Sequence, residues 1–419
     1  MEKKKKTYLN KATALLLSFL FIFSCTTKQI PEKKELLKLG GWVMEMDLNG
    51  EALPFSFELN KTNGTWGMAI INDQEKILVS DVVVKNDSLI AKLPVFESEF
   101  KLAIKDPENM VGLWLNYYKG PNYKINSVAK FFTRGRFRER PIKNVVQINP
   151  KYEVVFSKNT DSSYAAIGLF NQKENRLTGT FATETGDFRH LEGNVYGDSI
   201  FLSTFDGSHA FLFKGVSKGD SIVGNFWSGT HWKESWVAKP NDDFKLRNPD
   251  SLTFIKPKYD GINFSFENES GQIVSLSDET YKNKVVIVQV MGTWCPNCLD
   301  ETTYFTELYR AYNSEGLEIV AIAFERTRTK EKGLNNIKRL KDRTGADYEI
   351  LLGGSSSKDK AAEKLPMLNH VMSYPTAIFI DKKGNVRKIH TGFYGPGTGN
   401  LFLDYKKETE LFIESLLNE

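Results

Sequence analysis

The stretch from Met291 to Glu301 constrains the fold of this chain more than any other part. It reads Met-Gly-Thr-Trp-Cys-Pro-Asn-Cys-Leu-Asp-Glu and follows an apolar run, residues 285–290, that is rich in β-branched side chains. A run so short and so apolar is typical of a buried strand. After it, apolar residues recur near the helical period of 3.6 residues. The sequence therefore places Cys295 and Cys298 where a buried strand gives way to a helix N-terminus.

This position predicts a reactive thiol pair. The partial positive charge of a helix N-terminus favours a thiolate, and can lower the pKa of a cysteine from about 8.5 by a unit or more. We expect Cys295 to be the exposed nucleophile and Cys298, one turn further in, to be the buried resolving thiol. Two residues three apart in a helix satisfy the limit of about 7 Å between Cα atoms that a disulfide sets.

Other uses of a C-x-x-C pair stay open at this point. The pair could form half of a zinc site, but the chain has three cysteines, and the third, Cys25, is distant in sequence. Since there is no second C-x-x-C and no nearby His pair with ligand spacing, we expect no metal. A purely structural disulfide is the other alternative. We also expect no organic cofactor, because the chain has no flavin or nicotinamide motif.

The residues from Trp294 to Cys298, after a buried strand and before a helix, resemble the thioredoxin active site. Glu301 extends the motif to C-x-x-C-x-x-E, which narrows the resemblance to membrane-tethered thiol–disulfide oxidoreductases of the TlpA/ResA type. Residues 374–386 resemble the cis-proline, strand, turn and strand of the same fold. The resemblance covers roughly residues 255–419 and implies an α/β thioredoxin-like C-terminal domain.

The resemblance also implies roles for individual residues. Pro375 is expected to be cis and to face the cysteines, which leaves the backbone of Tyr374 open to pair with an extended substrate. Trp294 and Tyr374 are expected to contact that substrate. Glu301 lies on the helix face of Cys298, where a carboxylate raises the pKa of the thiol and can accept its proton. Its alternative role is to stabilise the first helical turns.

The expected elements of this domain follow the same patterns. A hairpin is expected over residues 262–276, and a loop over residues 353–357. The expected strands and helices are residues 285–291, 317–324, 348–352, 376–380 and 386–390 for strands, and 295–313, 330–343 and 405–417 for helices.

The first 24 residues are typical of a signal peptide. Lysines precede an apolar stretch, residues 12–23, that is too short to span a membrane. Cys25 follows at once and resembles the lipidated cysteine of a bacterial lipobox, although Phe23 is bulky where a small residue is usual. We predict lipidation of Cys25, with residues 25–40 as a tether. Ordinary signal cleavage, with an incidental cysteine, is the alternative.

These signals predict a periplasm-facing lipoprotein of the bacterial cell envelope, held to the membrane by its anchor. Thr26 follows Cys25 without an acidic retention residue, which favours the outer over the inner membrane. The envelope is oxidising, so an unprotected thiol pair there would become a disulfide. The first eleven residues, with five lysines and one glutamate, account for the net charge of +4. We therefore expect no basic face for nucleic acid.

Residues 41–245 show β patterns throughout. Short alternating runs separated by turn residues predict an all-β barrel or sandwich. Similar motifs recur at an offset of roughly 110 residues, which predicts two related units, about 41–140 and 150–240, although all β meanders share such features. The basic cluster between them, residues 134–140, is predicted to be a solvated linker. The tryptophans of the region would fill a core or stack on a ligand.

The leading functional prediction is an envelope thiol–disulfide oxidoreductase, more specifically a reductase of protein disulfides. Cys295 would form a mixed disulfide with the substrate, and Cys298 would resolve it. A membrane electron donor would then restore the dithiol. Related proteins assist cytochrome c maturation or other thiol maintenance.

Two functions of other kinds remain open. A ligand- or partner-binding lipoprotein would use the β region and keep the thioredoxin-like domain as an accessory. A thiol peroxidase would need the motif P-x-x-x-T-x-x-C, whose proline and threonine positions hold Val288 and Gly292 here.

Overall fold

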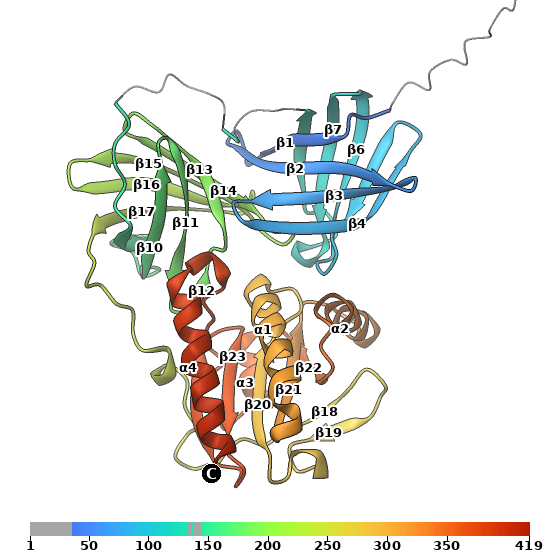
Figure 1. The fold of residues 1–419 in the computed structure, drawn as a ribbon, viewed down its shortest axis with the longest axis vertical. Coiled ribbons are helices and arrows are strands. Elements are labelled where there is room, and N and C mark those ends of the chain that lie inside the picture. Colours follow the sequence, from blue (N-terminus) through green and yellow to red (C-terminus); the bar gives the residue numbers. More distant parts are fainter. Residues whose placement is uncertain (1–35, 132–135, 138–143) are drawn as a thin grey trace, which may run out of the picture. The chain divides into compact units, whose positions relative to one another are not determined.

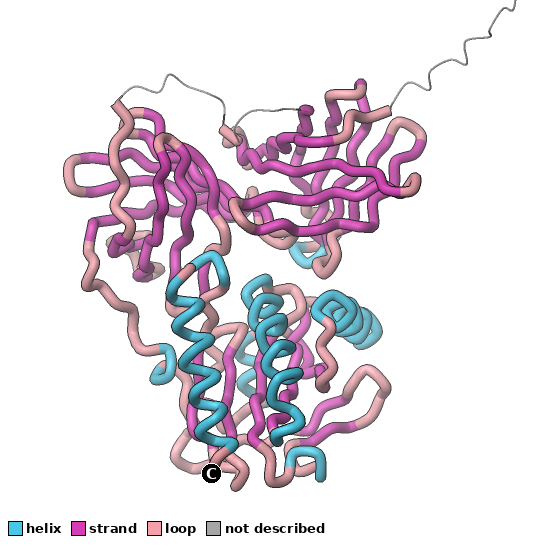
Figure 2. Tube along the Cα trace, viewed as in Figure 1, coloured by secondary structure: helices cyan, strands magenta, loops and turns pink. Residues whose placement is uncertain are grey.

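The alternating patterns of the N-terminal half form strands of two separate sheets (Figure 1). The computed structural model describes residues 36–131, 136–137 and 144–419, which belong to one compact unit. The predicted signal peptide, Cys25 and most of the predicted tether lie outside the described residues. Figure 2 shows that the α-helices belong to the C-terminal part of the chain.

The first sheet is a closed antiparallel barrel, in which β1 pairs with both β2 and β8. Alternation is clearest in β8, where every second side chain is buried in the barrel. Asn63 and Asp73, both at φ 52°, make tight turns, a conformation that Asn and Asp tolerate well. The strands are β1 Gly40–Asp47, β2 Ala52–Thr62, β3 Thr65–Asn72, β4 Glu75–Lys85, β5 Ser88–Lys92, β6 Ser98–Asp106, β7 Asn109–Asn116 and β8 Lys124–Phe131.

The second sheet has the order β10-β9-β17-β16-β15-β14-β13-β11-β12, and a further pairing of β10 with β11 closes it around a second core. The all-β barrel predicted for this half is confirmed. The strands are β9 Lys151–Phe156, β10 Tyr164–Lys173, β11 Arg176–Thr183, β12 Gly186–Asp187, β13 Leu191–Tyr196, β14 Ser199–Phe205, β15 Ala210–Lys218, β16 Ser221–Ser228 and β17 Trp232–Pro240.

The motifs that repeat in the sequence lie on corresponding strands, β5–β8 in one sheet and β14–β17 in the other. Gly112 in β7 and Gly224 in β16 share one constraint. An added Cβ would lie 2.0 Å from the carbonyl oxygen of Lys101 in the first case and 2.2 Å from that of Lys214 in the second. Each position therefore requires glycine. A common origin of the two units stays a prediction that these matching constraints support.

The two sheets interlock through aromatic and basic side chains. Phe205, at the end of β14, stacks on Phe55 of the first barrel with ring centroids 4.6 Å apart. Arg136 is 5% exposed, donates to the carbonyl oxygen of Ser203 at 2.9 Å and pairs with Glu192 at 3.0 Å. The prediction of a solvated linker is therefore wrong for Arg136, because its charge is matched inside the junction. The rest of that basic cluster, apart from the neighbouring Phe137, lies outside the described residues.

The C-terminal part is a seven-stranded sheet of order β19-β18-β22-β21-β20-β23-β24. The three strands β20, β21 and β22 are parallel, and β23 runs antiparallel beside β20. The strands are β18 Ser265–Glu267, β19 Ile273–Ser275, β20 Val285–Met291, β21 Leu317–Glu325, β22 Glu349–Ser355, β23 Thr376–Ile380 and β24 Val386–Thr391. This is the expected α/β thioredoxin-like fold.

The helices of this part are α1 Pro296–Tyr312, α2 Lys330–Thr344, α3 Lys358–Lys364 and α4 Asn400–Leu417. Helix α1 packs on α4, with the rings of Tyr304 and Tyr405 centred 6.0 Å apart. All seven residues of β20 are buried, so the cysteines follow a strand at the centre of the core. Among the helices of the described residues, none is long and apolar enough to cross a membrane.

Two boundaries and one helix differ most from the expectation. Strand β22 continues to Ser355, through part of the expected loop, and α3 follows it although no helix was expected there. Helix α4 begins at Asn400 rather than at residue 405. Residues 353–355 and α3 are short and mostly polar, so they carry little hydrophobic periodicity, whereas the apolar residues 401–403 of α4 directly follow a glycine-rich loop.

Candidate active site

The two cysteines lie at the N-terminus of α1, as their position in the sequence predicts. Cys295 is the N-cap residue, and Pro296 occupies the first helical position, where its missing N–H has no helical partner. Cys298 is fully buried and Cys295 is 8% exposed. The expected exposure of Cys295 is therefore not observed.

The two thiols have opposite environments. A hydrogen bond from Cys298 lowers the pKa of Cys295, and the backbone N–H groups of Asn297 and Cys298 and the charge of Arg326 act in the same direction, against burial. Burial raises the pKa of Cys298 well above its ordinary value, and the charges of Cys295 and Glu301 add to this effect. Cys295 is thus the thiol that ionises first.

Glu301 is fully buried beneath the cysteines. Its Oε2 accepts a hydrogen bond from Nε2 of Gln289 in β20 at 2.8 Å, while its Oε1 has no partner among the described residues. Burial raises the pKa of Glu301 to about 8, which the bond from Gln289 opposes and the charge of Cys295 increases. The carboxyl group can therefore exchange a proton near neutral pH.

Pro375 and Tyr374 lie against Cys295. The Tyr374–Pro375 peptide bond is cis, as the resemblance implies, and Sγ of Cys295 donates to the carbonyl oxygen of Tyr374 at 3.4 Å. The ring of Trp294 meets that of Tyr374 edge to face, with centroids 5.7 Å apart. All the residues proposed for this site from the sequence, Cys25 apart, are thus brought together.

Glu325 holds the loop that carries the cysteines. Its carboxylate, 3% exposed at the end of β21, accepts hydrogen bonds from the backbone N–H of Thr293 at 2.9 Å and from the Thr293 hydroxyl at 2.7 Å. Asn336 of α2 donates to the same carboxylate at 3.1 Å. Glu325 therefore joins the loop before Cys295 to the end of β21 and to α2.

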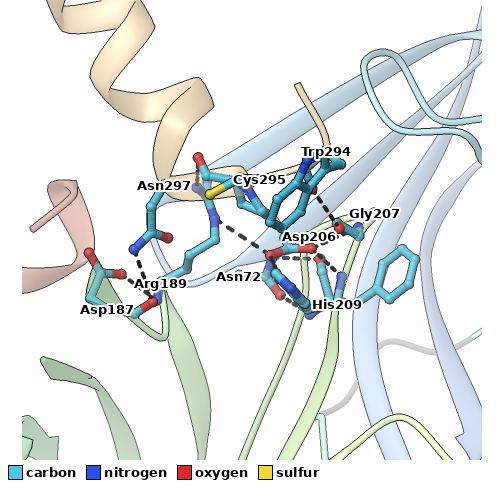
Figure 3. Close-up of polar contacts among 12 residues, drawn as sticks. Asn72, Asp187, Arg189, Asp206, Gly207, His209, Trp294, Cys295 and Asn297 are labelled. Carbon is cyan, nitrogen blue, oxygen red and sulfur yellow. Dashed lines mark hydrogen bonds and ion pairs between the residues drawn. The ribbon is translucent and has the colours of Figure 1, made fainter. Parts of the chain in front are cut away.

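The turn between β14 and β15 covers the active-site loop from the β region (Figure 3). The hydroxyl of Ser208 donates to the carbonyl oxygen of Trp294 at 3.1 Å. In the same turn, Asp206 accepts from the backbone N–H groups of Ser208, at 2.8 Å, and His209. The turn is thus held rigid by its own aspartate where it meets Trp294.

Arg189, between β12 and β13, makes the second contact. Its Nη1 donates to the carbonyl oxygen of Pro296 at 3.0 Å and to Asp300, and its Nη2 donates to Glu75 of the first barrel. Burial alone would lower the pKa of Arg189, but Asp300, Glu75 and Asp206 together raise it well above its ordinary value. The guanidinium therefore stays charged, and it is shared by acidic residues of the first barrel, the second sheet and the thioredoxin-like part.

A third contact covers the loop before the cis-proline. The hydroxyl of Ser373 donates to the carbonyl oxygen of Thr185 at 2.8 Å, and Nδ2 of Asn297 donates to that of Asp187 at 3.3 Å. The turn between β11 and β12 therefore contacts the residue before Tyr374, next to the backbone that is expected to be open to a substrate. Periodicity and motif could not reveal these partners, because they come from another sheet.

The C-terminal part of the chain is similar to known proteins. The AhpC/TSA family model matches residues 258–389. Thioredoxin-like protein YneN of Bacillus subtilis is 31% identical over 129 residues, which cover 31% of this chain and 68% of YneN. The chain belongs to the thioredoxin-like family.

Further relatives of the thioredoxin-like domain are named thiol-disulfide oxidoreductases. Thiol-disulfide oxidoreductase ResA of Geobacillus thermodenitrificans is 31% identical over 112 residues, 27% of this chain and 57% of that protein. ResA of Bacillus subtilis is 29% identical over 133 residues, 32% of this chain and 66% of that protein. The match spans less than two thirds of these ResA proteins.

Among solved structures, a thiol:disulfide interchange protein of the thioredoxin family from Chlorobium tepidum TLS is similar at 21% identity with a TM-score of 0.29. The similarity covers 38% of this chain and 94% of that one.

Proposed function

We propose that the chain is a thiol–disulfide reductase that acts on disulfides of other proteins in the bacterial envelope. One observation carries the proposal, namely that the two thiols at the N-terminus of α1 differ in character. Cys295 is favoured as a thiolate, and Cys298 is a buried thiol beside the titratable carboxyl of Glu301. This division is what a two-step exchange requires, since the thiolate is the nucleophile.

In the first step, the thiolate of Cys295 attacks one sulfur of the substrate disulfide. A bond forms between that sulfur and Cys295, the substrate S–S bond breaks, and the leaving thiolate takes a proton from solvent. Trp294, which precedes Cys295, and Tyr374, whose carbonyl oxygen lies 3.4 Å from the Cys295 sulfur, are the proposed contacts for the substrate.

In the second step, Cys298 gives its proton to the Glu301 carboxylate and attacks the sulfur of Cys295. The mixed disulfide breaks, the second substrate sulfur leaves as a thiolate that takes a proton from solvent, and a Cys295–Cys298 disulfide remains. Two electrons have passed to the substrate. A membrane electron donor must return two electrons before the next cycle.

The envelope location rests on the basic and apolar residues before Cys25 and on the predicted lipidation of that residue. The ResA-type resemblance suggests a substrate class, namely proteins with paired cysteines that the envelope oxidises, such as apocytochromes c. The preference for the outer membrane stays a prediction from Thr26.

The alternative of a ligand-binding lipoprotein is less favoured by the first barrel, whose interior is packed with aromatic side chains. Phe205 lies there within 5.2 Å of the ring centroids of both Phe100 and Trp114. The alternative of a peroxidase gains nothing from the AhpC/TSA match, because Val288 and Gly292 still occupy the motif positions.

The test is to trap the intermediate. The reduced Cys298→Ser chain is expected to accumulate a mixed disulfide with a peptide disulfide, and the matched Cys295→Ser chain is expected to form none. Mass spectrometry under acid quench identifies the adduct. Equal adducts on both variants, or none on either while both remain folded, would contradict the assignment of Cys295 as the attacking thiol and Cys298 as the resolving thiol.

A further inference from the structure

A cleft of about 780 Å³ lies between the first barrel and the segment that leads into α2. On the barrel side it is lined by the loop after β5 and by the 3-10 turn Tyr117–Lys119. On the other side it is lined by residues 326–329 and by Lys332 and Arg339 of α2. The cleft thus belongs partly to the thioredoxin-like domain and partly to the β region.

The cleft reaches the active site through Arg326. Its guanidinium lies over the ring of Trp294, 3.6 Å from the ring centroid, and Trp294 precedes Cys295 directly. Indole N–H of Trp294 donates to the carbonyl oxygen of Phe324 at 2.9 Å, so the ring is fixed in place. A polypeptide that presents a cysteine to Cys295 therefore has its neighbouring residues close to this cleft.

The cleft has an excess of positive charge. Six of its lining side chains are lysine or arginine, and two are glutamate. Both glutamates already have partners, since Glu97 pairs with Arg339 at 3.4 Å and Glu99 pairs with Lys101 at 2.8 Å. The acidic residues in the lining therefore leave most of the positive charge unmatched.

The unmatched cations lie together. Among the residues that the structure describes, Lys119, Arg326, Arg328 and Lys332 form no ion pair with an acidic side chain. Burial, together with the nearby charge of Arg326 and against the weaker effect of Asp206, lowers the pKa of Lys119 to about 8. Positive charges that repel one another favour an anionic ligand.

Two further features suit a peptide. The 3-10 turn places Tyr117, which is 42% exposed, in the cleft wall, where its ring can pack on apolar parts of a chain. Helix α2 begins at Lys330 with Thr329 as its N-cap, so the positive end of a 15-residue helix also faces the cleft.

We propose that this cleft binds an acidic segment of the protein substrate, next to the disulfide that Cys295 attacks. The inference rests on the proposed reductase function and adds its specificity. Arg326, Arg328, Lys119 and Lys332 supply the charge, and the carboxylates of the bound segment complete the ion pairs that the cleft lacks.

The test compares two synthetic peptides that share one internal disulfide and differ only in flanking residues, glutamates in one and lysines in the other. The reduced full chain is mixed with each peptide, and the second-order rate of disulfide reduction is measured. We expect the acidic peptide to react about tenfold faster at low salt. Raising the salt from 50 to 500 mM is expected to remove most of this preference, because exposed charges are screened.

The variant Arg328→Glu/Lys332→Glu is expected to lose the preference or reverse it. Its matched control is Lys338→Glu/Arg343→Glu, which makes the same charge change at exposed positions of the same helix outside the cleft lining. The control is expected to keep the preference. Equal rates for the two peptides with the unmodified chain, or an equal loss in both double variants, would overturn the inference.

A neutral small disulfide, bis(2-hydroxyethyl) disulfide, separates the two proposals. If the unmodified chain reduces it and still shows no charge preference, the cleft assignment fails and the reductase function stands. If the reduced chain leaves this disulfide and both peptides intact, the reductase function itself fails.

Discussion

Nη1 of Arg189 donates to the carbonyl oxygen of Pro296 at 3.0 Å, and this bond ties the β region to the first turn of the redox helix. Asp300, in the next turn, pairs with the same guanidinium. The β region is therefore part of the surroundings of the dithiol. Cys295, whose neighbours on both sides make these contacts, is 8% exposed.

Replacing Arg189 by methionine is expected to destabilise the chain and to uncover Cys295. Asp300, Glu75 and Asp206 would lose their shared cation inside the protein, and breaking such a buried network costs about 3–5 kcal/mol. We expect a lower free energy of unfolding in urea and faster alkylation of Cys295 by iodoacetamide under native conditions.

The matched control for that variant is Arg247→Met, whose partner Glu184 is held at the surface and whose own side chain is 66% exposed. A surface pair of this kind contributes about 0–1 kcal/mol. Alkylation at the same rate in the Arg189 variant and in the unmodified chain would show that Arg189 does not hold the cover.

Glu301→Gln is expected to change the pH dependence of stability. Burial raises the pKa of Glu301 to about 8, so the folded chain retains a proton that the unfolded chain releases near pH 4. The stabilisation is complete below pH 4 and is lost as the pH rises to 8. Between pH 5 and pH 9 the oxidised unmodified chain should lose roughly 4 kcal/mol relative to the variant.

Urea unfolding of both oxidised proteins at pH 5, 7 and 9 measures this difference, with Glu307→Gln, on the exposed face of α1, as the control. Glu301→Gln should also slow the second step of exchange by roughly 10- to 100-fold near pH 8. Parallel stability curves for the two proteins would mean that Glu301 is ionised throughout this range.

Phe205→Ala is expected to cost about 3–5 kcal/mol of folding free energy. The side chain belongs to β14 but is fully buried in the first barrel, stacked on Phe55 at 4.6 Å. Leu78→Ala, at a position that is 57% exposed, should change the free energy of unfolding by about 0.5 kcal/mol or less. A similarly small effect of Phe205→Ala would mean that the two sheets do not share a core.

The thioredoxin-like elements could be predicted because each has a strong local signal. Residues 285–291 form an unbroken apolar run, and the strand occupies the same residues. Thr329 and Gly345 bound α2 as an N-cap and a left-handed C-cap, close to the expected limits. By contrast, α3 has seven residues, of which one is buried, so it leaves almost no periodic pattern.

The cover of the active site could not be predicted from the sequence. Arg189 and Ser208 reach residues about a hundred positions away, and no spacing rule links them. Arg136 shows the same limit, because a basic residue in a basic cluster is buried only when distant groups such as Glu192 meet it. Local patterns report burial along an element, whereas these contacts depend on how whole sheets pack.

The reduction potential of the Cys295–Cys298 pair tests the central claim most directly. Burial opposes the ionised form of both thiols, which limits the thiolate stabilisation of the reduced form that makes a dithiol an oxidant. Equilibration in thiol redox buffers should give a potential near or below about −250 mV. A value near about −120 mV would contradict the account, because the pair would then oxidise its substrates.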